Sequence, residues 1–241
     1  MSKFLLIESG TIVCSVAFAI DGKVVGLRES NDEKAHASKL TVFIDQLAKE
    51  TGVNISALDA IVVSKGPGSY TGLRIGVSVA KGICYAAEKP LISISSLDSM
   101  VCGANVLYKS MIEKNGIDYL CPMIDARRME VYTALYDNTF IRIKDIEALV
   151  VDESTFKNNL SDKKILFFGN GAAKCCQTIN HPNAFFVDDF SPSAQFMIPL
   201  ALDAFAHQTF EDVAYFEPYY LKDFVATVSR KNLIPGLHQP I

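Results

Sequence analysis

The stretch best equipped for chemistry reads KGPGSYTGLRIG over residues 65–76. Its glycines can take positive φ and let the backbone approach another group closely. It also opens a predicted helix, whose free N–H groups can hold an anion. A tight strand–helix turn with a surface arginine explains the same residues, and the local physics favours that interpretation. The candidate contacts for an anion or nucleotide are Gly66, Gly68, Ser69, Thr71 and Arg74.

Two details refine the expectation for this turn. Ser69 or Thr71 can cap the predicted helix, because a side-chain oxygen there accepts from a free N–H group. Arg74 is unusual, since a cation in the first helical turn opposes the helix dipole. We therefore expect the Arg74 side chain to meet a carboxylate, a cluster of backbone carbonyls or a bound anion. No Gly-Lys-Ser/Thr ends the stretch, so it is not a Walker loop.

Metal and disulfide chemistry find little support in the sequence. The six cysteines form no C-x-x-C pair and mostly lie in apolar runs, where cysteine behaves as a small hydrophobe. No two of the four histidines stand four residues apart, so no helical histidine pair can bind a metal. We expect neither a metal site nor a bound cofactor.

Charge and hydropathy limit the partners. The net charge is −4, whereas a protein that alone gripped a nucleic-acid backbone would usually carry a basic field. A local basic patch that contacts nucleic acid is still compatible with this net charge. The first apolar run, residues 4–7, is too short for a signal peptide, and no run is long enough to span a membrane. We expect a cytoplasmic protein with no membrane partner.

The elements that must position these residues come in two similar sets. In the first half, Asp21-Gly22 is a strong hairpin signal. Strands are predicted at 3–8, 12–20, 23–29, 60–64 and 91–94, and helices at 33–51, 71–88 and 96–109. In the second half, strands are predicted at 118–125, 130–136, 140–144, 164–168 and 184–187, and helices at 153–159, 172–178 and 192–207.

Each half therefore reads β-β-β-α-β-α-β-α. This order predicts an α/β protein with the duplicated actin-like ATPase fold (ASKHA, ribonuclease H-like), divided into subdomains 1–110 and 111–241. Buried central strands covered by helices need such apolar runs. Residues 4–7, 61–63 and 165–168 are expected in the centres of the sheets. Two unrelated α/β segments that happen to align are the alternative.

That fold gives meaning to three further turns. Residues 8–11, Glu-Ser-Gly-Thr, lie where ATPases of this fold place an acidic residue and a phosphate turn, although a plain hairpin turn explains them too. Asp125 lies in the equivalent hairpin of the second half and is the one placed candidate for a catalytic acid. Arg127 and Arg128 would crowd it, so a turn with solvated charges is the preferred interpretation. Residues 168–172 loosely resemble an adenosine-binding glycine turn.

Several of these segments together resemble one known family. The run GPGSYTGLRIG at 66–76 is similar to the hallmark of the bacterial TsaB (YeaZ) family. Agreement continues in order at 15–17, 124–132, 169–172, 192–194 and 218–221, and covers nearly the whole chain. One departure is the turn at 8–11, since the family usually has an Asp-Thr-Ser-Thr-like sequence there.

The resemblance implies an accessory role in tRNA modification. TsaB-like proteins support TsaD, a homologue that transfers threonylcarbamoyl to N6 of an adenosine beside the anticodon, and a TsaE-like ATPase joins the complex. The resemblance implies no catalytic residue in this chain and an indirect relation to tRNA. A sugar-kinase-like phosphotransferase is the alternative, which would need Asp125 and a magnesium site. A peptidase is a third possibility, but it would need a metal pair or a nucleophile–base set.

The helix at 71–88 is apolar around nearly its full circumference, so it needs cover on two sides. Gly72, Gly76, Ala80 and Cys84 stand four apart and form a ridge of small residues. The tail from residue 215 to 241 could cover it, but the resemblance implies a four-helix bundle with TsaD. The same face could form a homodimer when TsaD is missing. The expected partner-binding residues are Leu40, Phe43, Leu47, Gly72, Leu73, Gly76, Val79, Ala80 and Ile83.

Overall fold

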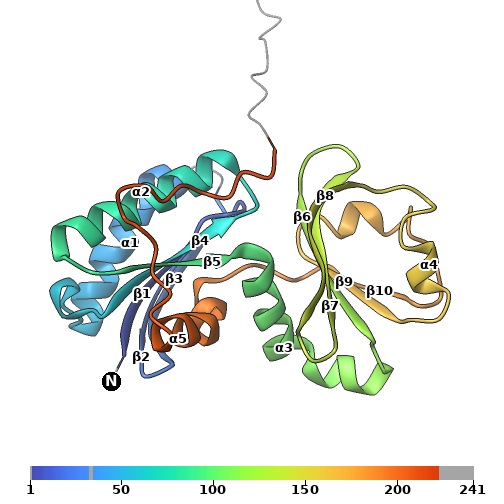
Figure 1. Ribbon diagram of the computed structural model, residues 1–241, viewed down its shortest axis with the longest axis horizontal. Helices are drawn as coiled ribbons and strands as arrows, with labels where there is room; N and C mark the ends of the chain where they lie inside the picture. Colours follow the sequence, from blue (N-terminus) through green and yellow to red (C-terminus); the bar gives the residue numbers. More distant parts are fainter. Residues whose placement is uncertain (1, 33–34, 223–241) are drawn as a thin grey trace, which may run out of the picture.

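Two five-stranded sheets with the same topology organise the computed structural model, which describes residues 2–32 and 35–222. The first sheet has the order β3-β2-β1-β4-β5 and the second has the order β8-β7-β6-β9-β10. In each, the first two pairings are antiparallel and the last two are parallel. This repeat confirms the predicted duplicated fold, and Figure 1 shows the two sheets as separate lobes.

The strand bounds follow the predicted runs except at β8, which was predicted at 140–144 and extends to Val150. In the first lobe they are β1 (Lys3–Glu8), β2 (Cys14–Ile20), β3 (Lys23–Ser30), β4 (Ala60–Gly66) and β5 (Leu91–Ser95). In the second lobe they are β6 (Tyr119–Asp125), β7 (Glu130–Asp137), β8 (Arg142–Val150), β9 (Ile165–Phe168) and β10 (Ala184–Val187). The three runs expected in the core, 4–7, 61–63 and 165–168, are all buried.

The helices differ more from the prediction. The first half of the chain has α1 (Ala35–Thr51), η1 (Ile55–Ala57), α2 (Tyr70–Ala87) and α3 (Ser96–Asn115), and the second half has α4 (Lys157–Leu160), η2 (Ala173–Cys175), η3 (Ala194–Met197) and α5 (Ile198–Ala206). The helix predicted at 172–178 is only a 3₁₀ turn. Its segment buries just Ala172 and Cys175, and a short helix without a longer apolar face is marginal in water.

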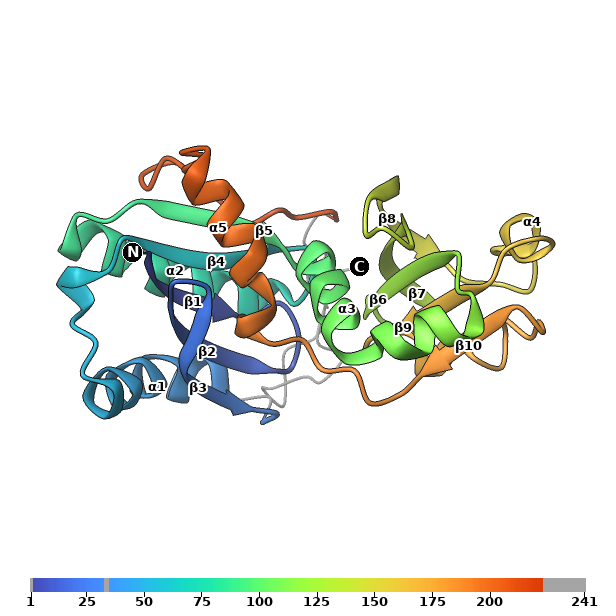
Figure 2. The ribbon, with the colours of Figure 1, turned by 90° about the horizontal axis from the view of Figure 1, so that it is seen from below.

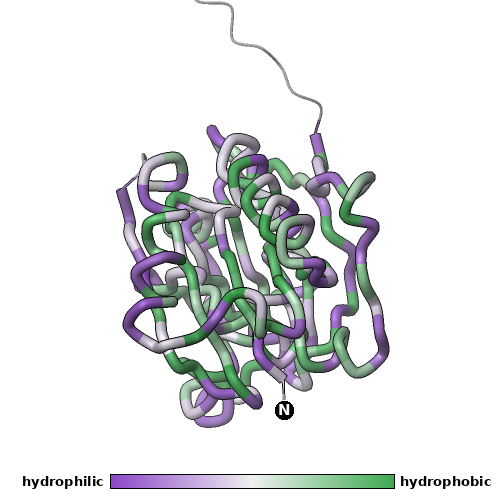
Figure 3. The backbone as a smooth tube through the Cα atoms, turned by 90° about the vertical axis from the view of Figure 1, so that its left-hand side faces the viewer, coloured by the Kyte–Doolittle hydropathy of each residue, from purple (hydrophilic) through white to green (hydrophobic). Residues whose placement is uncertain are grey.

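The hydrophobic core has four parts, one on each face of each sheet. The first sheet packs one face against α1 and α2, and its other face against η3 and α5. The second sheet packs one face against α3 and its other face against the α4–η2 side. Hydrophobic residues follow the strands through the middle of the molecule in Figure 3.

The last helix of each half covers the sheet of the other half. Leu97, Met100 and Val101 of α3 pack with Ile124 and Phe168 of the second sheet. The segment at residues 194–201 instead packs on the second face of the first sheet. Figure 1 and Figure 2 both place α3 between the two sheets. The division into 1–110 and 111–241 stays a prediction, and this exchange is a feature that it did not contain.

Residues 211–222, the C-terminal strap, return along the first lobe after α5. Glu211 bridges Leu91 of β5, and Lys81 of α2 donates to the carbonyls of Ala214 and Phe216. Figure 1 shows the strap in red passing over α2. The strap thus covers one side of α2, as the tail interpretation proposed, although residues 223–241 of that proposal lie outside the described residues. No helix in residues 2–32 and 35–222 is long and apolar enough to cross a membrane.

Candidate functional site

The glycine turn between β4 and α2 packs on the turn that follows β1. Ser69 N donates to Gly10 O at 2.6 Å. A Cβ added to Gly68 would collide with the Gly10 backbone, and one added to Gly72 would collide with the Ser9 carbonyl. Glycine is therefore required at both positions because another part of the chain lies against them.

The cap of α2 uses Ser69, as one of the two predicted alternatives had it. Ser69 Oγ accepts from Gly72 N at 3.2 Å. The backbone N–H and the hydroxyl oxygen of Ser69 are therefore both engaged within the chain, while Thr71 is exposed. Gly66 precedes a cis peptide bond to Pro67 and lines a cavity of about 370 Å³ together with Lys65 and Asp98 of its own half. Anion contact by this turn stays a prediction.

Arg74 meets aromatic rings where a carboxylate, carbonyls or an anion was expected. Its guanidinium carbon lies 4.6 Å from the centroid of the Tyr70 ring, and the Tyr70 and Tyr220 centroids are 4.8 Å apart. A hydrogen bond to Tyr220 is the main reason that the pKa of Arg74 is raised, and the Glu217 carboxylate contributes a weaker attraction. Arg74 thus makes a cation–π contact with Tyr70 of its own helix and joins α2 to the C-terminal strap through Tyr220.

The acidic residue of the 8–11 turn is buried. Glu8 is 1% exposed, and its Oε1 accepts from Gly10 N at 2.7 Å. Burial raises the pKa of the Glu8 carboxyl, and hydrogen bonds from Gly10, Ser64 and Ser9 only partly oppose that shift. Glu8 Oε2 and the hydroxyls of Ser9 and Ser96 have no hydrogen-bond partner among the described residues. This turn is therefore part of the interior of the molecule.

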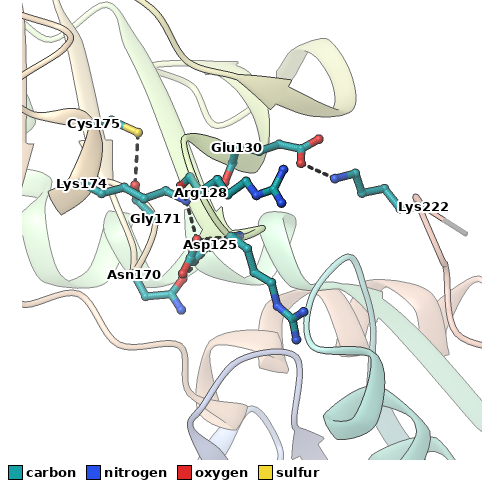
Figure 4. Close-up of polar contacts among 9 residues, drawn as sticks. Asp125, Arg128, Glu130, Asn170, Gly171, Lys174, Cys175 and Lys222 are labelled. Atoms are coloured by element: carbon teal, nitrogen blue, oxygen red, sulfur yellow. Dashed lines mark hydrogen bonds and ion pairs between the residues drawn. The ribbon is translucent and has the colours of Figure 1, made fainter. Parts of the chain in front are cut away.

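The hairpin of the second lobe holds Asp125 in place (Figure 4). Lys174 forms an ion pair with Asp125 and also donates to the carbonyls of Arg128 and Glu130 at 2.7 and 2.6 Å. Asp125 Oδ1 accepts from Arg127 N at 2.9 Å. The candidate catalytic acid thus serves as a structural anchor of its own hairpin.

The predicted partner-binding residues divide into two groups. Phe43, Val79 and Ile83 are partly buried at the surface of α1 and α2. The other six are buried in this chain's own core: Leu40, Leu47, Gly72, Leu73, Gly76 and Ala80. The predicted ridge of small residues therefore faces inward, because a Cβ on Gly76 would meet the Ser9 side chain. The ridge is thus an internal contact of this chain and not the predicted partner surface.

The face of α2 that is open lies on the opposite side of the same helix. Ser78, Gly82 and Ala86 are exposed and stand four apart. A Cβ on Gly82 would meet nothing within 4 Å. We call these three residues and their partly buried neighbours Val79 and Ile83 the outer face of α2. Next to it, Tyr85 is 86% exposed.

Comparisons with known proteins match a TsaD family model and several TsaB relatives. A family model described as "TsaD: tRNA N6-adenosine threonylcarbamoyltransferase" matches residues 26–226. The Escherichia coli tRNA threonylcarbamoyladenosine biosynthesis protein TsaB is 30% identical over 232 residues, which cover 93% of this chain and 96% of that one. The chain belongs to the TsaB family. The Haemophilus influenzae TsaB is 26% identical, over 92% of this chain and 94% of its own.

A solved structure agrees with this family assignment. A Pseudomonas aeruginosa protein described as similar to peptidase YeaZ has a TM-score of 0.78 at 26% identity, covering 92% of this chain and all of that one. The described residues contain no group of three His, Cys, Asp or Glu side chains that could hold a metal ion. Sequence reasoning missed the burial of Glu8 and the aromatic setting of Arg74. The sequence signal for the setting of Arg74 was the pair Tyr70 and Tyr220, but these two residues come close only after folding.

Proposed function

We propose that this chain is a non-catalytic subunit that supports a TsaD-like catalytic subunit in the synthesis of threonylcarbamoyladenosine in tRNA. Membership of the TsaB family supports the pathway. The single observation that carries the proposal of a partner is the outer face of α2. A row of small residues there lets another helix approach closely, and the partly buried Val79 and Ile83 add apolar surface beside it.

Phe43 of the adjacent helix α1 packs against the same core cluster as Val79 and Ile83. Val42 is 45% exposed, and Phe43 is only partly buried. A face built from two adjacent helices suits a partner that contributes two helices of its own, packed by ridges and grooves. The same face could pair two copies of this chain when the TsaD-like subunit is missing. A TsaE-like ATPase would join the complex, and tRNA would be reached through the catalytic subunit in a cytoplasmic assembly.

Two positive features support the non-catalytic part of the proposal. The 8–11 turn, where related ATPases hold phosphate, is packed against the glycines of α2. Asp125 is neutralised by Lys174, which also ties it to the hairpin backbone. A sugar-kinase-like phosphotransferase would need that carboxylate free to face its substrate.

Capture of the TsaD-like subunit by this chain tests the surface. Gly82→Leu should keep the fold, because the added atoms enter open space, and should weaken capture at least tenfold. Ser110→Leu on α3 is the matched control, since it also adds a leucine at an exposed helical position. Undiminished capture by Gly82→Leu would place the partner elsewhere.

Steady-state ATP turnover tests the absence of catalysis. The pure chain should show negligible hydrolysis with magnesium present. Turnover that Asp125→Asn abolishes would favour the phosphotransferase alternative over the accessory role.

A further inference from the structure

The hairpin between β6 and β7 carries two arginines that the proposed function does not use. Arg127 has φ of 73° and Arg128 has φ of 51°, and both side chains are exposed. Side-chain-bearing residues rarely adopt such conformations, and hairpin turns that need two in succession usually place Asn, Asp or Gly there. Within residues 2–32 and 35–222, no ion pair joins either guanidinium to a carboxylate. An unusual backbone kept at two adjacent exposed arginines points to a function.

The backbone of this hairpin is held in place by the neighbouring segment at residues 170–174. Lys174 reaches from η2 to three oxygens of the hairpin, and Asn170 Oδ1 accepts from Asp125 N at 3.1 Å. Ala126 N donates to Glu130 O at 3.0 Å. Figure 4 shows Lys174 and Asn170 converging on Asp125. A fixed backbone limits the freedom that the two guanidinium groups would lose on binding a ligand.

The local charge is positive although the chain as a whole is acidic. Lys222 of the C-terminal strap pairs with Glu130, so that carboxylate does not neutralise an arginine. Four cations and two carboxylates gather here, in a chain of net charge −4: Arg127, Arg128, Lys174, Lys222, Asp125 and Glu130. The surplus resides on the two arginines. Their forked N–H donors match phosphate oxygens in pairs.

We propose that Arg127 and Arg128 bind phosphates of the tRNA backbone. The inference rests on the proposed function, which supplies tRNA as the polyanion of the reaction, and it adds a direct contact to the indirect one assumed above. Guanidinium groups on two successive residues suit a chain of phosphates better than a single carboxylate. Contacts of this kind position an RNA without reading its sequence.

Fluorescence anisotropy of labelled tRNA, titrated with the complex of this chain and a TsaD-like subunit at several salt concentrations, tests the proposal. Each lost phosphate contact lowers the slope of log K against log salt by about 0.7 to 0.9. Arg127→Ala/Arg128→Ala should therefore lower the slope by roughly 1.5 and weaken binding about 10- to 30-fold near 0.1 M salt. If that variant folds poorly, Arg127→Gly/Arg128→Gly removes the same groups and suits positive φ.

Lys109→Ala/Lys114→Ala is the matched control, because it removes two exposed positive charges from α3. Equal loss in the control, or an unchanged slope in the arginine variant, would overturn the assignment. Loss of TsaD capture by the arginine variant would also overturn it and would make the hairpin a protein interface. A wild-type chain that binds tRNA through these arginines but captures no TsaD-like subunit would instead refute only the proposed function.

Discussion

Three glycines of α2 offer a graded test of which side of the helix faces the core. A Cβ added to Gly82 meets nothing within 4 Å, one on Gly76 would lie 2.1 Å from Ser9 Oγ, and one on Gly72 would lie 2.2 Å from Ser9 O. Glycine in a helix interior costs about 1 kcal/mol relative to alanine. Gly82→Ala should therefore raise the free energy of unfolding by about 1 kcal/mol.

The other two substitutions gain the same helical propensity but must displace atoms. At Gly76 the obstacle is a side-chain hydroxyl that can rotate, and overpacking of this kind costs about 1–3 kcal/mol. The net effect of Gly76→Ala should be a loss of about 1 kcal/mol. At Gly72 the obstacle is a backbone carbonyl at the end of β1, so the loss should be larger, about 2–3 kcal/mol.

Urea unfolding followed by circular dichroism measures these differences, provided that the slope with denaturant stays constant. Ser9→Ala removes the hydroxyl, which has no hydrogen-bond partner among the described residues, and leaves the Ser9 Cβ position 3.1 Å from the atom added at Gly76. The double variant Ser9→Ala/Gly76→Ala should thus recover most of the loss, with a coupling of about 1 kcal/mol. If Gly72→Ala and Gly76→Ala unfold at the wild-type midpoint, these glycines do not face the core and the assignment of the outer face is wrong.

Further outcomes follow from single groups. Burial raises the pKa of Glu8 above the 4.5 of the unfolded chain. The contribution of Glu8 to stability is therefore fully present below pH 4.5 and is lost as the pH rises through the folded-state pKa. In urea midpoints measured from pH 4 to 8, Glu8→Gln should flatten that decline. Lys81→Met removes the donor to the carbonyls of Ala214 and Phe216, so hydrogen exchange in the strap should speed up while the global midpoint changes little, and unchanged exchange would contradict the anchoring role. Cys176 is the exposed thiol, whereas the other five are buried or half-buried, so a thiol reagent should modify one group quickly, and Cys176→Ser should abolish that fast phase.

Local pattern was enough to predict the strands and their order. Alternating and apolar runs mark β1, β4 and β9 because these strands are buried, and the Asp21-Gly22 turn fixes the β2–β3 hairpin. The repeat of one element order in both halves then predicted the fold. The short helices of the second half could not be predicted in this way, because the length of η2 depends on the small apolar surface that it buries.

The orientation of α2 could not be predicted from its composition. An apolar helix with glycine and alanine on several sides has no face that is polar enough to identify solvent. Its inward side is decided by the Ser9-Gly10 backbone, which lies far away in the sequence and accepts only glycine beside it. For the same reason, six residues assigned to a partner are buried in the core, while Ser78, Gly82 and Ala86 are exposed.

The exchange of α3 and α5 between the lobes means that the order of residues along the chain and the mechanical units of the molecule do not coincide. A cut near residue 116 would leave each fragment with an uncovered sheet face and with a helix separated from the sheet that it covers. Neither fragment should be stable alone, but the two could reassemble when mixed. A rotation of one lobe against the other would carry each exchanged helix with the sheet that it covers. Bending would then be confined to the two chain crossings, before α3 and before η3, and the buried Glu8 carboxyl lies beside Ser96 at the first of them.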